Sequence, residues 1–228
     1  MANWQAVPGT AALSLGSGAD GSMWHVGTNN KIYRWNGGGW DPGPDDGISA
    51  LCVTADRSGA PWHIGQDLAI YRWVGRWQKF HGTVALALAC GGDSVMWHIG
   101  QNLNLWSWDG DAGWIQDPFA ASVTSVAVES TGVAWHIGGG GMIYRQIPGG
   151  WSPVSGPAGS LAAAANGVVY HLGDHRPPWN LPWWTVYQWN GGGGWSAYAP
   201  NGMRGQAIAA DGNGTLWGRS GTMVYRYL

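Results

Sequence analysis

The hydrophobic residues of this chain recur in short runs separated by glycine, asparagine and aspartate. One group of runs covers residues 48–54, 60–64, 69–73 and 76–80. β-Branched and aromatic residues fill the runs, and turn-forming residues lie between them, which is typical of short β-strands joined by tight turns. The pattern therefore predicts groups of four strands.

A four-residue motif, Trp-His-Ile/Val-Gly, returns once in each group. Clear copies begin at Trp24, Trp62, Trp97 and Trp135, a weaker copy at Tyr170 and a degenerate one at Trp217. Successive copies lie 38, 35, 38, 35 and 47 residues apart. A repeat of about 40 residues that holds four strands is typical of a β-propeller blade.

Two further aromatic positions follow the motif in each copy. The second position is occupied by Tyr33, Tyr71, Trp106, Tyr144, Tyr187 and Tyr225, and the third by Trp40, Trp77, Trp114, Trp151 and Trp195. The fifth copy carries eight extra residues, an insertion around residues 174–184. The chain ends before the third position of the sixth copy, and the segment that begins at Trp4 reads like the missing strand.

These repeats predict an all-β fold, a six-bladed β-propeller with four antiparallel strands per blade. The N-terminal strand closes the last blade, so residues 1–228 form a single propeller domain without a linker. The first hairpin of a blade uses Asp20-Gly21 or Asn166-Gly167, which suit a turn that needs positive φ. In the second and fourth copies this turn is two residues longer, which accounts for the alternation of 38 and 35 residues.

Composition excludes several other classes of protein. The chain has 19 Trp and 40 Gly but only two Lys and one Glu, and 11% of its residues are charged. Helical bundles need more Lys and Glu, and disordered chains have fewer aromatics and more charge. No apolar run reaches the ~18 residues of a membrane span, and a net charge of −2 gives no basic footprint for nucleic acid.

The N-terminus and the two cysteines predict a cytoplasmic location. No basic or apolar segment of the signal-peptide kind follows Met1. Cys52 and Cys90 lie in apolar stretches, where buried free thiols are expected, although the sequence does not exclude a disulfide. Free thiols fit a reducing compartment.

The combination of Trp-His-Ile-Gly, Tyr-Arg-Trp and Gly-Gly-Trp resembles the tectonin repeat, over the whole chain. The six short copies are most similar to the mushroom tectonin. The resemblance implies a lectin for O-methylated glycans, with methylated mannose- or fucose-type sugars as plausible ligands and a role in defence or in recognition of foreign surfaces. Tyr170 and Gly218 depart from the motif in the last two copies.

The recurring histidines are the first set of candidate ligand-binding residues: His25, His63, His98, His136 and His171. On a strand each faces away from the neighbouring Trp, so it either donates to a sugar hydroxyl in a groove between blades or is buried and bonded to a neighbouring blade. Whole blades separate them, so no metal site is expected, and no cofactor is predicted.

Two other polar sets recur. Arg34, Arg72 and Arg145 could pair with a carboxylate of the neighbouring blade or donate a planar fork to sugar oxygens. Asn30, Asp67 and Asn102 lie in the turn between the second and third strands. They could bind vicinal hydroxyls or serve only the geometry of the turn.

The third-position tryptophans, Trp40, Trp77, Trp114, Trp151 and Trp195, are the expected walls of the sites. An indole can stack on the C–H face of a pyranose, and the flanking glycines allow close approach. A small apolar notch that buried one methyl group would gain about 0.8 kcal/mol. Several weak sites on one ring would then add avidity of roughly 10²–10⁴ on a dense glycan surface.

Two other functions stay open. No nucleophile or phosphate-loop motif is present, so an enzyme is not expected, although carboxylates at a propeller mouth could hydrolyse glycosides. A protein-interaction propeller without a sugar ligand would instead expose one dominant patch. The aromatic insertion at residues 174–184 is the candidate for such a patch and for self-association into a homo-oligomer.

Overall fold

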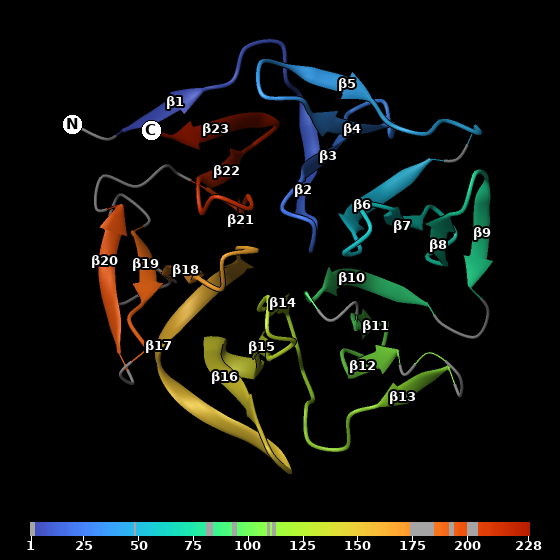
Figure 1. Cartoon of the computed structure of the whole chain (residues 1–228). Helices are drawn as coiled ribbons and strands as arrows, with labels where there is room; N and C mark the ends of the chain where they lie inside the picture. The colour runs from blue at the N-terminus through green and yellow to red at the C-terminus, as the bar shows by residue number, and fades with distance from the viewer. Residues whose placement is uncertain are drawn as a thin grey trace.

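The computed structural model describes residues 3–47, 49–80, 84–92, 95–108, 110, 113–173, 185–191, 194–199 and 205–228. Its strands form six four-stranded antiparallel sheets arranged around a central axis (Figure 1). The six-bladed propeller predicted from the repeats is therefore confirmed. Within each blade, neighbours in sequence pair with one another from the axis outward.

The strand bounds follow the repeats. The first blade contains β2 (Ala12–Ser17), β3 (Met23–Gly27), β4 (Ile32–Trp35) and β5 (Trp40–Pro42). The second contains β6 (Ala50–Ala55), β7 (Pro61–Gly65), β8 (Ile70–Trp73) and β9 (Trp77–Phe80). The third contains β10 (Ala85–Cys90), β11 (Met96–Gly100), β12 (Leu105–Trp108) and β13 (Trp114–Gln116).

The fourth and fifth blades share one long strand, β17 (Gly150–Ala163). The fourth blade contains β14 (Ser125–Val128), β15 (Ala134–Ile137), a 3-10 turn at Gly139–Gly141, β16 (Met142–Ile147) and the first part of β17. The fifth contains the second part of β17, β18 (Val169–Gly173), β19 (Val186–Trp189) and β20 (Trp195–Ala199). Because β17 passes from the rim of one blade to the axis of the next, the two sheets are continuous.

The sixth blade joins the two ends of the chain. It contains β21 (Ala207–Ala210), β22 (Leu216–Ser220), β23 (Met223–Tyr227) and β1 (Trp4–Ala6). Strand β1 pairs with β23, with Trp4 opposite Tyr227, so the N-terminal strand closes the last blade as predicted (Figure 1). This pairing gives the sixth blade four strands, as in the other blades.

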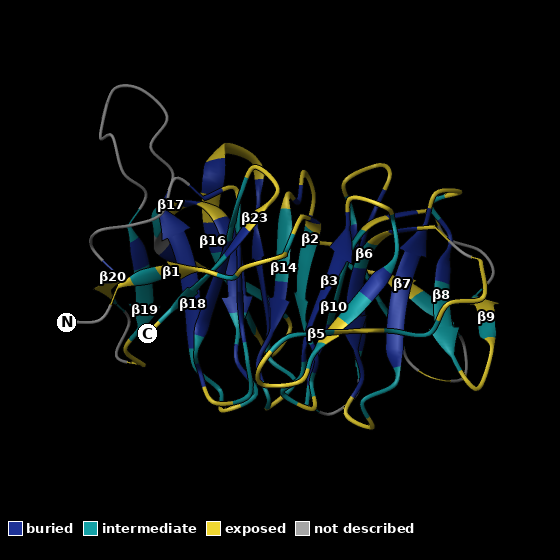
Figure 2. Cartoon of the chain, turned by 90° about the horizontal axis from the view of Figure 1, so that it is seen from above, coloured by how far each residue is buried: buried dark blue, intermediate teal, exposed yellow. Residues whose placement is uncertain are grey.

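The turns adopt the backbone conformations that the sequence predicted. Gly21 and Gly167, in the two short hairpins between the first and second strands, have φ of 83° and 85°. The longer hairpins of the second and fourth blades also end in glycine with positive φ, at Gly59 and Gly132. Exposed residues gather in such turns at the two faces of the ring. The second strands, such as β3 and β7, are buried, whereas the outer strands, such as β5 and β9, are partly exposed (Figure 2).

Large aromatic side chains fill the space between blades. In every blade the aromatic residue of the second strand packs on outer aromatics of the next blade around the ring. The groups are Trp24 with Trp77, Trp62 with Trp108 and Trp114, Trp97 with Trp151, Trp135 with Trp189 and Trp195, Tyr170 with Trp4 and Tyr227, and Trp217 with Trp35 and Trp40. Because blades diverge toward the rim, only the largest side chains span the gap there.

Within the described part of the chain, no helix is long and apolar enough to cross a membrane.

Candidate functional site

Three aromatic side chains from three adjacent strands meet in five of the blades. In the first blade the His25 ring stacks on Tyr33, with centroids 4.8 Å apart, and meets Trp40 edge to face at 4.2 Å. Equivalent triads are His63–Tyr71–Trp77, His98–Trp106–Trp114, His136–Tyr144–Trp151 and His171–Tyr187–Trp195. The structure thus brings the predicted His and Trp together, and adds the second-position Tyr or Trp between them.

The glycine that ends the Trp-His-Ile/Val-Gly motif seats the middle ring of the triad. A Cβ atom placed on Gly65 would lie 2.9 Å from Cε2 of Tyr71, and one on Gly138 would lie 3.0 Å from Cε2 of Tyr144. Ordinary carbon contacts are longer, about 3.5–4.0 Å. Any side chain at this position would push the aromatic ring away from its histidine.

The five histidines are buried and neutral. Their exposed fractions are at most 3%, and burial lowers the pKa of each to about 4. A neutral imidazole offers one N–H donor and one acceptor. The Nδ1 atoms of His25, His98 and His136 are buried without a hydrogen-bond partner among the described residues.

His63 is the most enclosed of the five histidines. Both of its ring nitrogens are buried, and its exposed fraction is 0%. This burial favours the packing role among the two that the sequence left open, and its contact with a ligand stays a prediction.

The arginines pair within their own blades, which corrects the predicted pairing with a neighbouring blade. Arg72 donates to Asp56 at 2.9 Å and lies over the Trp62 ring. The Trp62 indole N–H donates to the same carboxylate at 3.1 Å. The carboxylate comes from the first hairpin of the blade, so the local turn supplies the partner that a half-buried guanidinium needs.

The same arrangement recurs in two other blades. Arg145 lies over Trp135 and 3.5 Å from Glu129, while Arg34 lies over Trp24 and 3.4 Å from Asp20. These contacts favour the structural role of the arginines. Their use in ligand binding stays a prediction.

In the turn after the motif, the predicted Asn30 is off by one residue. Asn29, not Asn30, is equivalent to Asp67: Asn29 Nδ2 donates to the Tyr33 hydroxyl at 2.8 Å, and the Tyr71 hydroxyl donates to Asp67 at 2.8 Å. Asn30 occupies the left-handed position of the turn with φ of 60°, as Leu68 does with φ of 62°. The spacing from the motif distinguishes the two adjacent asparagines, since Asn29, Asp67 and Asn102 each lie five residues after the motif tryptophan.

Asn102, in the third blade, serves the turn in the same way as Asn29. Its side-chain oxygen accepts a hydrogen bond from the backbone N–H of Asn104 at 3.2 Å. A Cβ atom on Gly100 would lie 2.9 Å from this oxygen, so the amide covers the motif glycine. The turn residues thus hold the local backbone, and a ligand would meet them at the surface of the blade.

The fourth blade differs, because its triad opens into a pocket of about 470 Å³ beside the connection from the third blade. The pocket is lined by His136, Tyr144, Trp151, Phe119, Ile147 and several glycines, and none of its lining residues carries a formal charge at neutral pH. Pockets of 300–1,000 Å³ are typical for small molecules. Phe119 is 69% exposed and Ile147 is 43% exposed, so much of the pocket wall is apolar and accessible.

Asp117 holds two walls of this pocket together. Its Oδ1 accepts from the backbone N–H of Phe119 at 2.8 Å and of Ala120 at 2.9 Å, and its Oδ2 accepts from the indole N–H of Trp151 at 3.1 Å. By contrast, the indole nitrogens of Trp40, Trp114 and Trp195 are buried without a partner among the described residues. Trp151 is thus the wall whose orientation is fixed by a hydrogen bond.

Sequence reasoning missed Phe119 and the middle rings as parts of the site. The middle rings had a signal, since they recur at a fixed distance after the motif. The sequence held almost no signal for Phe119. It is one of two Phe in the chain and lies after Pro118 in a connection that differs from blade to blade. Its role depends on the neighbouring blade.

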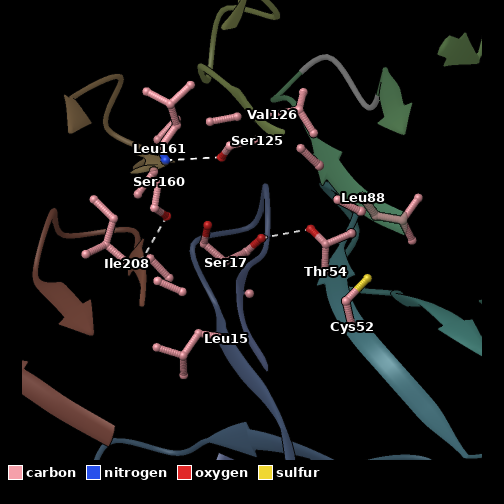
Figure 3. Close-up of a pocket in the computed structure, with 18 of the residues that line it drawn as sticks. Leu15, Ser17, Cys52, Thr54, Leu88, Ser125, Val126, Ser160, Leu161 and Ile208 are labelled. Atoms are coloured by element: carbon pink, nitrogen blue, oxygen red, sulfur yellow. Dashed lines mark hydrogen bonds between the residues drawn. The ribbon is translucent and has the colours of Figure 1, made fainter. Parts of the chain in front are cut away.

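The innermost strands line a second cavity, a central channel of about 470 Å³ (Figure 3). Its walls are mainly small and aliphatic, and hydrogen bonds tie neighbouring blades there, as from Thr54 Oγ1 to the Ser17 carbonyl at 2.9 Å. Cys52 lines this channel, and burial raises the pKa of its thiol to about 12. Neither Cys52 nor Cys90 forms a disulfide, as the sequence predicted.

Among the described residues no cluster of three His, Cys, Asp or Glu could hold a metal ion. The insertion at residues 174–184, predicted as a contact patch, lies outside the described residues.

No protein-family model and no curated protein matches this chain. Its fold is similar to the solved structures of streptogramin B lyase (TM-score 0.62, 12% identity, covering 100% of this chain and 97% of the other) and of a proposed gluconolactonase (TM-score 0.68, 12% identity, 99% and 91%). The extracellular domain of a proposed hybrid two-component system from B. thetaiotaomicron is also similar (TM-score 0.60, 12% identity, 99% and 41%). At this identity the likeness shows the β-propeller fold alone.

Proposed function

We propose that this propeller is a multivalent lectin that binds uncharged, O-methylated glycans at repeated sites between its blades and makes or breaks no bond. The observation that carries the proposal is the triad of a neutral histidine, an aromatic ring and a tryptophan, repeated in five blades. The tectonin-like motif positions these residues, and the resemblance to that family of lectins supports the same function.

The chemistry of the triad suits a sugar. Indole and phenol rings present apolar faces to the C–H groups of a pyranose, while a neutral imidazole can donate to or accept from a hydroxyl. His136 lines the open pocket of the fourth blade together with Tyr144 and Trp151. A sugar in this pocket would therefore lie against all three members of the triad.

An O-methyl group on the sugar requires a small apolar surface that buries the methyl. One buried methyl gains about 0.8 kcal/mol, and discrimination for one methylene-sized group is limited to about 1–3 kcal/mol. Selectivity at a single site is therefore modest. Several sites on one ring raise the overall affinity for a dense surface without any new contact.

A glycan array that presents each sugar in methylated and unmethylated form tests this function. We expect binding to methylated sugars at least fivefold above binding to their unmethylated forms. Binding that is indifferent to methylation would remove the methyl pocket from the proposal. Failure to bind any glycan would overturn the lectin function and favour a protein-interaction propeller.

Trp151→Phe provides the residue test, because the pocket wall keeps an aromatic ring but loses the indole N–H that Asp117 fixes. We expect weaker binding of methylated glycans and an intact fold by circular dichroism. Ile115→Ala is the control, since Ile115 is an exposed residue outside this pocket. Equal loss in both variants would show that the effect is not local.

A further inference from the structure

The repeated sites differ in what covers the motif glycine. In the first and second blades a turn side chain folds back over it: Asn29 Oδ1 would lie 2.7 Å from a Cβ on Gly27, and Asp67 Oδ1 would lie 2.8 Å from a Cβ on Gly65. The same side chains bond the hydroxyls of Tyr33 and Tyr71. The polar edge of each triad is thus covered by the protein itself.

In the fourth blade glycine replaces this covering residue. The sequence position equivalent to Asn29 and Asp67 is Gly140, which has φ of 81° and no side chain. The Tyr144 hydroxyl consequently has no hydrogen-bond partner in the described part of the chain, and the three atoms nearest to a Cβ on Gly138 belong to Tyr144 and His136. Loss of the covering side chain therefore uncovers the Tyr144 hydroxyl, while His136, which is 3% exposed, forms a buried part of the pocket lining.

The same blade also gains an apolar wall. Phe119 packs 3.9 Å from a Cβ placed on Gly150, and the carboxylate of Asp117 fixes both the Phe119 backbone and Trp151. The second blade instead places charges across its triad, since Lys79 lies over the Tyr71 ring and 2.8 Å from Asp67. The two sites thus present opposite surfaces, one apolar and one ionic, on the same backbone.

We propose that the sites are not equivalent and that the fourth blade holds one site per chain selective for multiply O-methylated sugars. Gly140 and Phe119 are its specificity-determining residues. This inference rests on the lectin function proposed above. A sugar with several methyl ethers has few hydroxyls left to pair, so it suits a pocket whose lining side chains are uncharged and mostly apolar, with Tyr144 and His136 as polar groups beside the Trp151 indole. It fits poorly beside the Asp67–Lys79 ion pair, which it would desolvate without replacing its hydrogen bonds.

Titration calorimetry of the full chain with methyl α-mannoside, its mono-O-methyl derivatives and its fully O-methylated derivative tests the inference. We expect the fully methylated mannoside to bind one site per chain at least tenfold more tightly than any other site. The Phe119→Ala variant should lower the affinity of that site by roughly tenfold, because the ligand would no longer remove the apolar surface of the phenyl ring from water. Ile115→Ala is the matched control, since Ile115 is 50% exposed on the neighbouring strand and outside the pocket.

A second variant adds a side chain at the pocket instead of removing one. Gly140→Asn adds the side chain that Asn29 carries in the first blade, and asparagine tolerates positive φ better than other residues. We expect this variant to lose the high-affinity site for the fully methylated mannoside. It should still bind mono-O-methyl mannosides at the sites of the other blades. Nuclear magnetic resonance of the Trp151 indole N–H, which should shift on binding in the native chain only, localises the effect.

The outcomes separate the two proposals. If the native chain binds none of these mannosides, and the glycan array is also blank, the lectin function itself is wrong. If it binds them at sites of equal affinity, or if Phe119→Ala and Gly140→Asn both retain one tight site for the fully methylated mannoside, the sites are equivalent and the inference is overturned.

Discussion

At the scale of single residues, the buried histidines make this protein sensitive to acid. Burial lowers the pKa of His25, His63, His98, His136 and His171 to about 4, from an ordinary value of 6.5. The unfolded chain therefore binds more protons than the folded one between about pH 6.5 and 4. The free energy of unfolding therefore falls as the pH falls through that window. The stabilisation that the neutral imidazoles contribute is complete only above it.

We expect the urea midpoint of unfolding to drop steeply below pH 6.5, with each imidazole contributing a loss of up to about 2 kcal/mol by pH 5. Hydrogen bonding from Lys79 lowers the pKa of the Asp67 carboxyl to about 2. Protonation of such carboxylates therefore reduces the free energy of unfolding only below this pH window. Urea titrations from pH 7.5 to 4.5 measure the effect. In the His63→Phe variant the proton uptake on unfolding should be smaller by about one. A flat profile would contradict the burial of these imidazoles as neutral groups.

At the scale of elements, the end of each second strand depends on glycine. Gly65 ends β7, and a Cβ there would lie 2.8 Å from Asp67 Oδ1 and 2.9 Å from the Tyr71 ring. The strand, the turn and the third strand meet at this one position. The motif glycine is therefore required by packing, in addition to any access it gives to a ligand.

We expect Gly65→Ala to destabilise the fold by about 1–3 kcal/mol, as overpacking of a buried site does. Gly39→Ala is the control, because a Cβ on Gly39 meets no atom within 4 Å. Thermal unfolding of both variants measures the difference. If the two variants unfold at the same temperature, Tyr71 can move without cost and the close contact does not hold the strand.

At the scale of the whole molecule, the two ends of the chain are held together by one pair of strands. The backbone N–H of Asn3 donates to the Leu228 carbonyl at 2.8 Å, and that of Leu228 donates to the Asn3 carbonyl at 3.1 Å. Strand β1 covers the outer edge of the sixth blade, where Trp4 packs against Tyr227 at 5.3 Å between ring centroids. Without β1 this blade would have three strands and an open edge.

We expect removal of residues 1–8 to lower the melting temperature by at least 10 °C and to promote aggregation through the exposed edge. A circular permutant that begins at Thr10 and joins Leu228 to Asn3 through a short loop should restore the native melting temperature, because β23 and β1 then form a hairpin. Differential scanning calorimetry measures both. A permutant as unstable as the truncation would show that closure does not depend on this pairing.

The sequence alone determined the blades of this propeller, because period-two strands, glycine turns and recurring aromatics are local signals that each repeat carries in full. It also determined the closing strand, since Trp4 fits the slot left empty after Tyr227. It did not determine where polar side chains point. One of the two roles predicted for the arginines was an ion pair with a neighbouring blade, yet the carboxylate beside Arg72 comes from its own hairpin.

Only the tertiary structure decided which site is open. The pocket of the fourth blade is lined by Phe119 from the connection before it, and the turn position that carries Asn29 or Asp67 in other blades is Gly140 here. Phe119 and Gly140 are 21 positions apart, and neither belongs to the repeated motif. A repeat pattern records what the blades share, whereas a binding site depends on how two different blades meet in space.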